Sequence, residues 1–168
     1  MKTYSPLFSL DSTVAISGGG ATLAIGMARG LLDAGARVAI WSRQAKTVSR
    51  ALATLNAAER AIGIVADAGV PDAIQNALED TEKKLGCPNV LINAVGGNLS
   101  KGTFTEIDLD LFRQTVELNL MAGCVIPTKI LAKHWIDRGL PGCIINIASM
   151  TSYKPLSDVG AYGAAKAG

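Results

Sequence analysis

Long apolar stretches without charge are missing from this sequence. The longest, around residues 118–126, is too short to span a bilayer. The N-terminal MKTYSPLFSLDSTVAIS has no continuous apolar segment, so we expect no signal peptide. Runs of basic residues are missing as well, and the net charge is only +2. We therefore expect a cytoplasmic protein that binds neither nucleic acid nor membranes.

Metal-ligating residues are scarce and widely spaced. Cys87, Cys124 and Cys143 are odd in number and lack the spacing of metal ligands. The single histidine, His134, has no cysteine near it in the sequence. We expect reduced, mostly buried thiols, a histidine on the surface and no metal site. Aromatic residues make up only 5% of the chain, and we expect both tryptophans to pack in its core rather than stack on a ligand.

Short apolar runs are present instead, and they alternate with longer segments of helical periodicity. Hydrophobic residues make up 49% of the chain, enough for a single domain over residues 1–168. The predicted strands are residues 14–17, 37–41, 62–66, 90–94 and 143–148. The predicted helices lie near residues 22–34, 46–57, 71–85 and 109–138. Nearly continuous apolar strands that alternate with helices predict an α/β fold, in which a doubly wound, Rossmann-like parallel sheet has helices on both faces.

The last helical segment begins around Ala161, and the sequence ends at Gly168. A helix of roughly two turns is marginal unless packing holds it. We therefore expect the sequence to be part of a longer chain whose C-terminal part is missing.

The stretch SGGGATLAIG, from Ser17 to Gly26, joins the first predicted strand to the first predicted helix. In a doubly wound sheet this turn is where a pyrophosphate binds, because the helix N-terminus offers free N–H groups and the positive end of the helix dipole. The dinucleotide fingerprint G-x-G-x-x-G fails, however, because Leu23 stands at the third glycine position. The stretch alone fits a nucleotide site and a structural turn about equally well.

Residues suited to a nucleotide and to catalysis follow the later strands. Asp67 and Ala68 follow the third strand, where a carboxylate can accept a hydrogen bond from an adenine amine. The segment NAVGG, residues 93–97, ends the fourth strand with small residues that let the backbone approach a ribose or a nicotinamide. The candidate catalytic residues are Asn119 in the long helix, Ser149 after the fifth strand, and Tyr162 and Lys166 in the last helix.

The order and spacing of these pieces resemble the short-chain dehydrogenase/reductase family over essentially the whole sequence. The segments NAVGGN, ELNLMAGCVIPTKILAK, IINIASM and KPLSDVGAYGAAKAG are most similar to its fructuronate reductases or D-mannonate oxidoreductases of the short-chain type. In the family the loop reads T-G-x-x-x-G-x-G. Here Ser17 replaces the threonine, Gly18 matches, and Thr22 and Ala24 replace the later glycines. Ala24 is small enough for close helix packing, and the Thr22 hydroxyl can donate to a pyrophosphate.

The candidate cofactor-binding residues come from the strand ends and the last helix. They are Ser17, Gly18, Gly20, Thr22, Leu23, Ser42, Arg43, Asp67, Ala68, Asn93, Ala94, Val95, Tyr162 and Lys166.

The end of the second strand bears on the choice of cofactor. A carboxylate there would bond the ribose 2′-OH of NAD(H), but the sequence has Ser42 followed by Arg43. A guanidinium beside a neutral residue suits a 2′-phosphate, so we expect NADP(H) rather than NAD(H). The alternative is that Arg43 is an ordinary solvated residue at a helix entry.

The resemblance implies carbonyl reduction by a hydride, with a proton delivered to the developing alkoxide. A tyrosine of ordinary pKa, about 10, is a poor base at neutral pH. Lys166 lies on the same helix face as Tyr162, and its charge favours the phenolate. By resemblance, Lys166 also bonds the nicotinamide ribose, Asn119 holds a water of the proton relay, and Ser149 stabilises the substrate oxygen.

Each of these residues also has an ordinary explanation: packing for Tyr162, solvation for Lys166, and a satisfied polar group in a helix for Asn119. Ser152 is the rival to Ser149 but lies further from the strand end.

We therefore expect an NADP(H)-dependent oxidoreductase that interconverts a carbonyl and a secondary alcohol on a small sugar acid or polyol. Lys101 and Lys154 are candidates to attract the carboxylate of such a substrate. The alternatives are another reductase of the family, such as one acting on 3-oxoacyl chains, and a catalytically silent nucleotide-binding protein. The resemblance also implies homo-dimers or homo-tetramers, and a substrate-capping segment beyond the end of this sequence.

Overall fold

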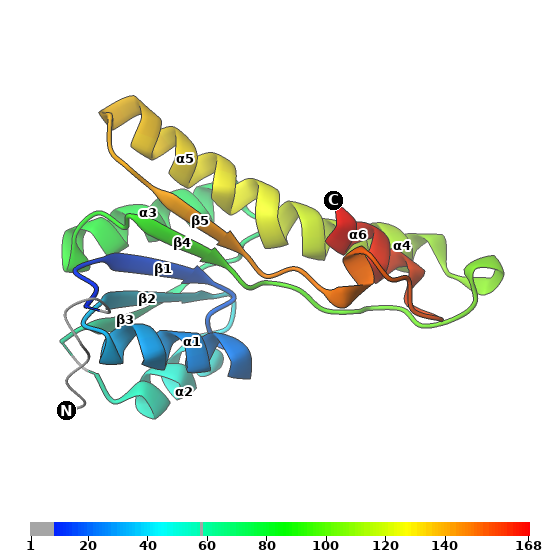
Figure 1. Cartoon of the computed structure of the whole chain (residues 1–168), viewed down its shortest axis with the longest axis horizontal. Helices are drawn as coiled ribbons and strands as arrows, with labels where there is room; N and C mark the ends of the chain where they lie inside the picture. The colour runs from blue at the N-terminus through cyan, green and yellow to red at the C-terminus, as the bar shows by residue number, and fades with distance from the viewer. Residues whose placement is uncertain (1–8, 58) are drawn as a thin grey trace.

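Five short parallel strands alternate with helices in the computed structural model, which describes residues 9–57 and 59–168 (Figure 1). The strands are β1 (Thr13–Ser17), β2 (Arg37–Ser42), β3 (Ala61–Val65), β4 (Val90–Asn93) and β5 (Cys143–Asn146). The helices are α1 (Thr22–Asp33), α2 (Ala45–Leu55), α3 (Pro71–Leu85), α4 (Leu109–Val116), α5 (Ile126–Arg138) and α6 (Gly160–Ala167). A π-helical stretch, η3 (Glu117–Val125), joins α4 to α5, and η2 (Phe104–Glu106) and η4 (Met150–Ser152) are short 3-10 turns.

The strand order across the sheet is β3-β2-β1-β4-β5, and all neighbouring strands are parallel. The chain first moves outward from β1 to β3, then returns to the other side of β1 and moves outward again to β5. This reversal between β1 and β4 is the switch point at which doubly wound sheets bind ligands, outside the carboxyl ends of the strands. The predicted doubly wound α/β fold is confirmed.

Alternate residues of the central strands face two different helical layers. Val14 and Ile16 of β1 pack in a cluster with α1 and α2, whereas Ala15 packs in a cluster with α3 and α5. Trp41 and Trp135 are both buried in the second cluster, so the prediction that the tryptophans pack in the core is correct. Side chains alternate between the two faces of a sheet along each strand. The nearly continuous apolar strands therefore supply core side chains to the helical layer on each face.

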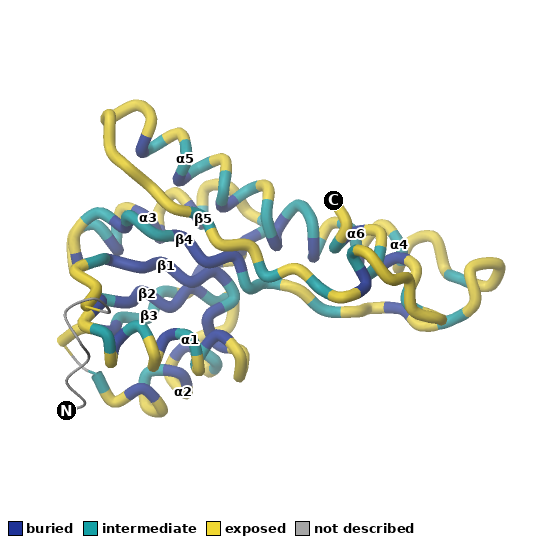
Figure 2. The backbone as a smooth tube through the Cα atoms, viewed as in Figure 1, coloured by how far each residue is buried: buried dark blue, intermediate teal, exposed yellow. Residues whose placement is uncertain are grey.

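Strand β5 departs from the expectation of helices on both faces. Ile144 packs against the α3 and α5 layer, but Ile145 is 43% exposed on the opposite face. Helices α1 and α2 cover β1, β2 and β3 on that side and do not reach β5 (Figures 1 and 2). Helices α4 and α6 pack against each other beyond the carboxyl end of the sheet, where much of the surface is exposed (Figure 2).

The predicted long helix over residues 109–138 is continuous but not regular. Its middle, η3, is π-helical, and within it the Asn119 side chain donates to the carbonyl of Thr115, 2.8 Å away, as well as to the carbonyl of Gly97. By length and composition alone the helix is apolar enough to cross a membrane. Its α5 part packs against α3 and β4, as a core helix of an α/β domain does.

Candidate cofactor and catalytic site

A cleft of about 350 Å³ lies at the carboxyl ends of the strands, at the switch point of the sheet. Four strand ends and the π-helical stretch contribute to it. The lining residues are Gly18, Gly20, Ala21, Ser42, Arg43, Gln44, Thr47, Arg50, Ala66, Asp67, Ala68, Ala94, Val95, Gly96, Leu118 and Ala122. Eight of the predicted cofactor-binding residues are therefore brought together: Gly18, Gly20, Ser42, Arg43, Asp67, Ala68, Ala94 and Val95.

The glycine loop packs too closely on its neighbours to carry side chains. Gly18 has a φ of +76°, and a Cβ there would lie 2.6 Å from the nitrogen of Val95. The N–H groups of Gly18 and Gly19 both donate to the carbonyl of Trp41. Ala24 is fully buried in the α1 layer, so an alanine at this position still allows close packing of helix and sheet.

Helix α1 begins with an open N-terminus beside this loop. Ala21, at the N-cap, makes no side-chain capping bond, and the first turn contains no acidic residue. The first N–H groups of a helix lack partners within the helix and attract anions. Thr22 and Leu23 begin this turn and are exposed, but neither lines the cleft.

Two guanidinium groups lie at the end of β2. Arg43 lines the cleft beside Ser42, as expected, and Arg50 reaches it from α2, where its Nη2 donates to the carbonyl of Gly20 over 3.4 Å. Sequence reasoning missed Arg50 and Thr47. The signal for both was their spacing of three residues on a helix that begins two residues after Arg43.

The end of β3 supplies a carboxylate to the same cleft. The Oδ1 atom of Asp67 accepts the N–H of Gly69 over 2.9 Å, which fixes the carboxylate at the cleft wall. Ala68 follows it and is buried.

Ser17 and Asn93 lie beneath the cleft rather than in it. They are paired in register on β1 and β4, and both are buried. Asn93 Nδ2 donates to Thr128 and to Asn146, which ties β4 to α5 and β5. Among the described residues, Ser17 Oγ and Asn93 Oδ1 have no hydrogen-bond partner. The structure thus gives Asn93 a bracing role within the protein.

Asn119 is buried and bonded to the loop after β4. Its Oδ1 accepts the N–H of Gly97 over 2.9 Å, and its Nδ2 donates to the carbonyl of Gly97 over 2.7 Å. Gly96 lies directly beside it: a Cβ there would be 2.7 Å from Asn119 Oδ1 and 3.1 Å from Lys166 Nζ. Gly96, which lines the cleft, therefore lies against two of the four predicted catalytic residues, Asn119 and Lys166.

Lys166 reaches this point from α6. Its Nζ donates to the carbonyl of Ile147 over 2.9 Å and lies 6.0 Å from the centre of the Tyr162 ring. Burial lowers the pKa of Lys166, and the nearby Cys124 opposes this shift. Tyr162 is half-buried, one turn earlier on the same helix.

The two serines that competed for the substrate role differ in their contacts. Ser152 Oγ donates to the carbonyl of Lys166 over 2.7 Å and so holds α6 to η4. Ser149 Oγ accepts only a long contact of 3.3 Å from the N–H of Thr151, and among the described residues its hydroxyl donates to no acceptor. Ser149 is therefore the freer hydroxyl for a ligand.

Two expectations from the sequence, the surface position of His134 and the burial of the thiols, need correction. His134 is not a surface residue, because its side chain is only 11% exposed, and its Nε2 lies 3.4 Å from Cys87 Sγ. Sequence reasoning missed this neighbour because 47 positions separate the two residues. The thiols are not mostly buried, since Cys87 and Cys124 are half-buried and Cys143 is exposed. Lys101 and Lys154 are exposed and lie outside the cleft lining, and their role toward a substrate carboxylate stays a prediction.

A model of the family described as short chain dehydrogenase matches residues 12–168. The chain belongs to the short-chain dehydrogenase family. It is 31% identical to an uncharacterized oxidoreductase, UxuB, of Bacillus subtilis, over 92% of this chain and 60% of that protein. It is 30% identical to a 2-dehydro-3-deoxy-D-gluconate 5-dehydrogenase of Formosa agariphila, over 96% of this chain and 61% of that protein. This short-chain dehydrogenase thus spans about 60% of the length of these relatives.

Solved structures of short-chain dehydrogenases share the fold. One from Bacillus anthracis has a TM-score of 0.86 at 26% identity and covers 94% of this chain and 63% of its own. A xylitol dehydrogenase with bound NAD⁺ has a TM-score of 0.87 at 20% identity (95% and 61% covered). A Pseudomonas aeruginosa short chain oxidoreductase with bound NADPH has a TM-score of 0.84 at 23% identity (93% and 61% covered). The fold thus accommodates either nicotinamide cofactor.

Proposed function

We propose that this chain is the cofactor-binding part of an NADP(H)-dependent oxidoreductase that interconverts a carbonyl and a secondary alcohol on a small sugar acid or polyol. The observation that carries the proposal is the meeting of Asn119 and Lys166 at Gly96, on the wall of the cleft. A cleft at the switch point of a sheet can bind many kinds of nucleotide. A lysine and a tyrosine on one helix at the end of that cleft favour hydride transfer to a carbonyl.

The residues of the cleft fit a dinucleotide. Gly18 and Gly20 line the cleft and carry no side chain that would stand between the backbone and a pyrophosphate, and the uncapped N-terminus of α1 offers N–H groups to its oxygens. Asp67 suits an adenine amine. Ala94 to Gly96 suit the ribose and nicotinamide end, because their small side chains leave that wall of the cleft open.

The preference for NADP(H) rests on charge at the end of β2. Arg43 and Arg50 both line the cleft there with Ser42 and Thr47, and β2 ends without a carboxylate. Two guanidinium groups can bind a 2′-phosphate through charge-assisted hydrogen bonds, whereas the 2′-OH of NAD(H) leaves them unpaired.

A bound nicotinamide ring supplies or accepts the hydride. Tyr162 gives a proton to the developing alkoxide, and the ammonium of Lys166 on the same helix favours the phenolate that results. The hydroxyl of Ser149 donates to the substrate oxygen as its charge forms. Asn119 holds the loop at Gly97 against the helix and so fixes the wall beside Lys166.

The substrate class is a small sugar acid or polyol. The sequence resemblance favours it, and the relative from Formosa agariphila is a sugar-acid dehydrogenase by its name. Lys101 and Lys154 would attract the carboxylate at long range only, because both are exposed and lie outside the cleft lining. Replacing Lys154 by alanine should raise the KM for an acidic substrate. An unchanged KM would remove Lys154 from the proposal.

Cofactor preference is tested by measuring dissociation constants for NADPH and NADH with the full chain. We expect tighter binding of NADPH, and we expect Arg50→Gln to weaken NADPH by on the order of tenfold while leaving NADH nearly unchanged, since charged hydrogen bonds contribute about 1.5–3 kcal/mol. Lys46→Gln, on the same helix but outside the cleft lining, is the matched control. Tighter binding of NADH would contradict the NADP(H) assignment.

Turnover is tested by following NADPH oxidation with a panel of keto sugar acids and with a 3-oxoacyl thioester. We expect turnover with keto sugar acids that Tyr162→Phe abolishes without loss of NADPH binding. Turnover with the thioester alone would favour a 3-oxoacyl reductase, and cofactor binding without any turnover would favour a silent nucleotide-binding protein.

The assembly and compartment belong to the same proposal. Large apolar side chains on the long helix and around η4 are exposed, which fits a homo-dimer or homo-tetramer formed through these elements. Three free cysteines fit the reducing cytoplasm.

A further inference from the structure

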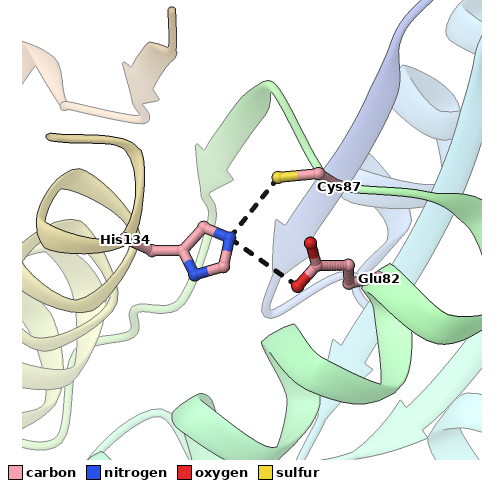
Figure 3. Close-up of side chains that lie close together, drawn as sticks. All are labelled: Glu82, Cys87 and His134. Carbon is pink, nitrogen blue, oxygen red and sulfur yellow. Dashed lines mark hydrogen bonds and ion pairs between the residues drawn. The ribbon is translucent and has the colours of Figure 1, made fainter. Parts of the chain in front are cut away.

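The side chains of Glu82, Cys87 and His134 point toward one another beside the loop that leads into β4 (Figure 3). None of the three lines the cofactor cleft. Glu82 lies in the last turn of α3, Cys87 in the loop between α3 and β4, and His134 in α5. Their ligand atoms all lie within 4.8 Å of one another, the one group of this kind among the described residues.

Both neighbours approach the same ring nitrogen of the histidine. Cys87 Sγ lies 3.4 Å from His134 Nε2, and Glu82 Oε2 lies 3.8 Å from that atom. A nucleophile with its base and orienting carboxylate has a different arrangement, because the carboxylate then bonds the other ring nitrogen. Burial, followed by the charge of Glu82, raises the pKa of the Cys87 thiol, which is the opposite of nucleophile activation.

Convergence on a single point is the arrangement of metal ligands. In a tetrahedral zinc site with Zn–S near 2.3 Å and Zn–N and Zn–O near 2.05 Å, ligand atoms are about 3.6 Å apart for sulfur and nitrogen and about 3.3 Å apart for nitrogen and oxygen. In this structure the distance from Cys87 Sγ to His134 Nε2 is 3.4 Å, and the distance from Glu82 Oε2 to His134 Nε2 is 3.8 Å. Small side-chain movements would therefore bring both pairs of atoms to the spacing of zinc ligands.

We propose that Glu82, Cys87 and His134 bind a zinc ion, with a water molecule as the fourth ligand. On binding, Zn²⁺ displaces the proton of the Cys87 thiol to solvent, while Glu82 binds as the carboxylate and His134 as the neutral imidazole. No oxidation or reduction takes place.

The surroundings support a positioned site. Arg138 bonds Glu82 Oε1 and leaves Oε2 directed to the histidine. The indole N–H of Trp135 donates to the carbonyl of Pro88 over 2.7 Å, which fixes α5 against the Cys87 loop. A cavity of about 250 Å³, lined in part by Cys87, Pro88 and Trp135, adjoins the site on its Cys87 side.

The site would clamp α3, the following loop and α5 together. It lies at the opposite end of the sheet from the predicted catalytic groups. The site is independent of the proposed oxidoreductase function, and either assignment can fail without the other.

Cobalt(II) titration of the full chain, produced without a histidine tag, tests the ligand set. We expect a thiolate-to-cobalt charge-transfer band and the intense visible bands of tetrahedral cobalt, both abolished by stoichiometric zinc. Cys87→Ser should remove the charge-transfer band, and His134→Gln should weaken cobalt binding by about tenfold or more. Cys143→Ser, which removes an exposed thiol outside the group, should change neither.

Thermal unfolding gives a second readout that does not depend on cobalt. At free zinc about 100 times above its Kd, we expect Tm to rise by roughly 5–10 °C in the wild type. The rise should be absent in Cys87→Ser and reversed by a chelator, while NADPH affinity stays the same in both proteins. Absence of a thiolate band in the wild type, a band that depends on Cys143 instead of Cys87, or an equal zinc effect on Cys87→Ser would each overturn the proposal.

Discussion

At the scale of single residues, Gly96 is where the cofactor cleft meets the catalytic groups. It lines the cleft, and its missing Cβ leaves room for Asn119 Oδ1 and Lys166 Nζ. Its neighbour Gly97 is bonded to Asn119 through its backbone alone, and a Cβ there would meet only Leu118, at 3.9 Å. A side chain is thus sterically excluded at Gly96 but has room at Gly97.

Replacing Gly96 by alanine should therefore be costly, because the methyl group would displace Asn119 and Lys166. We predict a loss of about 1–3 kcal/mol in the free energy of unfolding, as for other overpacked sites, together with weaker NADPH binding. Gly97→Ala is the matched control and should change the free energy of unfolding and the NADPH affinity much less. Denaturant unfolding and cofactor titration of the two variants measure this, and equal effects would contradict the prediction.

Lys166 should give the stability of the fold a pH dependence. Burial lowers its pKa from the ordinary 10.5, so between the two pKa values the unfolded chain holds a proton that the folded chain has released. The stability penalty is complete below the folded pKa and disappears as the pH rises to 10.5. We predict that the free energy of unfolding of the wild type rises over this range relative to Lys166→Met. Parallel profiles of the two proteins would refute this.

The sequence predicted residues of the cleft where a local pattern marks them. Gly18, Asp67 and Ala94 follow strands, and strand ends can be read from apolar runs. His134 was misplaced because its environment is made by Cys87, which is distant in the sequence. The spacing of Arg50 on α2 was its one signal in the sequence, and the packing of α2 against the glycine loop is what brings it to the cleft.

At the scale of elements, the buried pair of Trp41 and Thr81 ties α3 to the sheet. Trp41 Nε1 on β2 donates to Thr81 Oγ1 on α3 over 3.0 Å, and Thr81 Oγ1 donates in turn to the carbonyl of Ala77. Both Trp41 and Thr81 are buried, so the indole N–H has no access to water.

Thr81→Val keeps the shape of the side chain and removes the acceptor of that N–H. We predict a loss of about 1–3 kcal/mol in the free energy of unfolding, the cost of an unsatisfied buried donor. Thr115→Val is the control: Thr115 is equally buried, but its hydroxyl only donates to the carbonyl of Leu111 within the helix. Urea unfolding compares the two, and a smaller loss for Thr81→Val than for Thr115→Val would be evidence against this role.

Element positions were predictable to within one or two residues, except where tertiary contacts decide. The predicted strand over residues 143–148 ends at Asn146, and the last helix begins at Gly160. The π-helical stretch η3 had no signal in the periodicity, since it accompanies the contact of Asn119 with Gly97, a residue of another element.

At the scale of the whole molecule, exposed apolar side chains gather away from the sheet. Phe104 is 80% exposed, Leu109 is 64% exposed and Tyr153 is 83% exposed, on the segments around α4 and α6 (Figure 2). This surface is the reason to expect self-association, because monomers rarely expose large apolar patches.

We predict that the average mass of the chain in sedimentation experiments rises with concentration. Leu109→Glu should shift the equilibrium toward the monomer, and Val70→Glu, an exposed apolar position at the N-cap of α3, should not. A mass equal to the monomer at every concentration would exclude assembly through this surface.

Hydrogen exchange with and without saturating NADPH tests the placement of the cofactor most directly. We predict slower exchange of the backbone N–H groups in residues 18–24 and 94–97, with no change around Cys87 at the other end of the sheet. Unchanged exchange in both segments when NADPH is bound would show that the switch-point cleft is not the cofactor site.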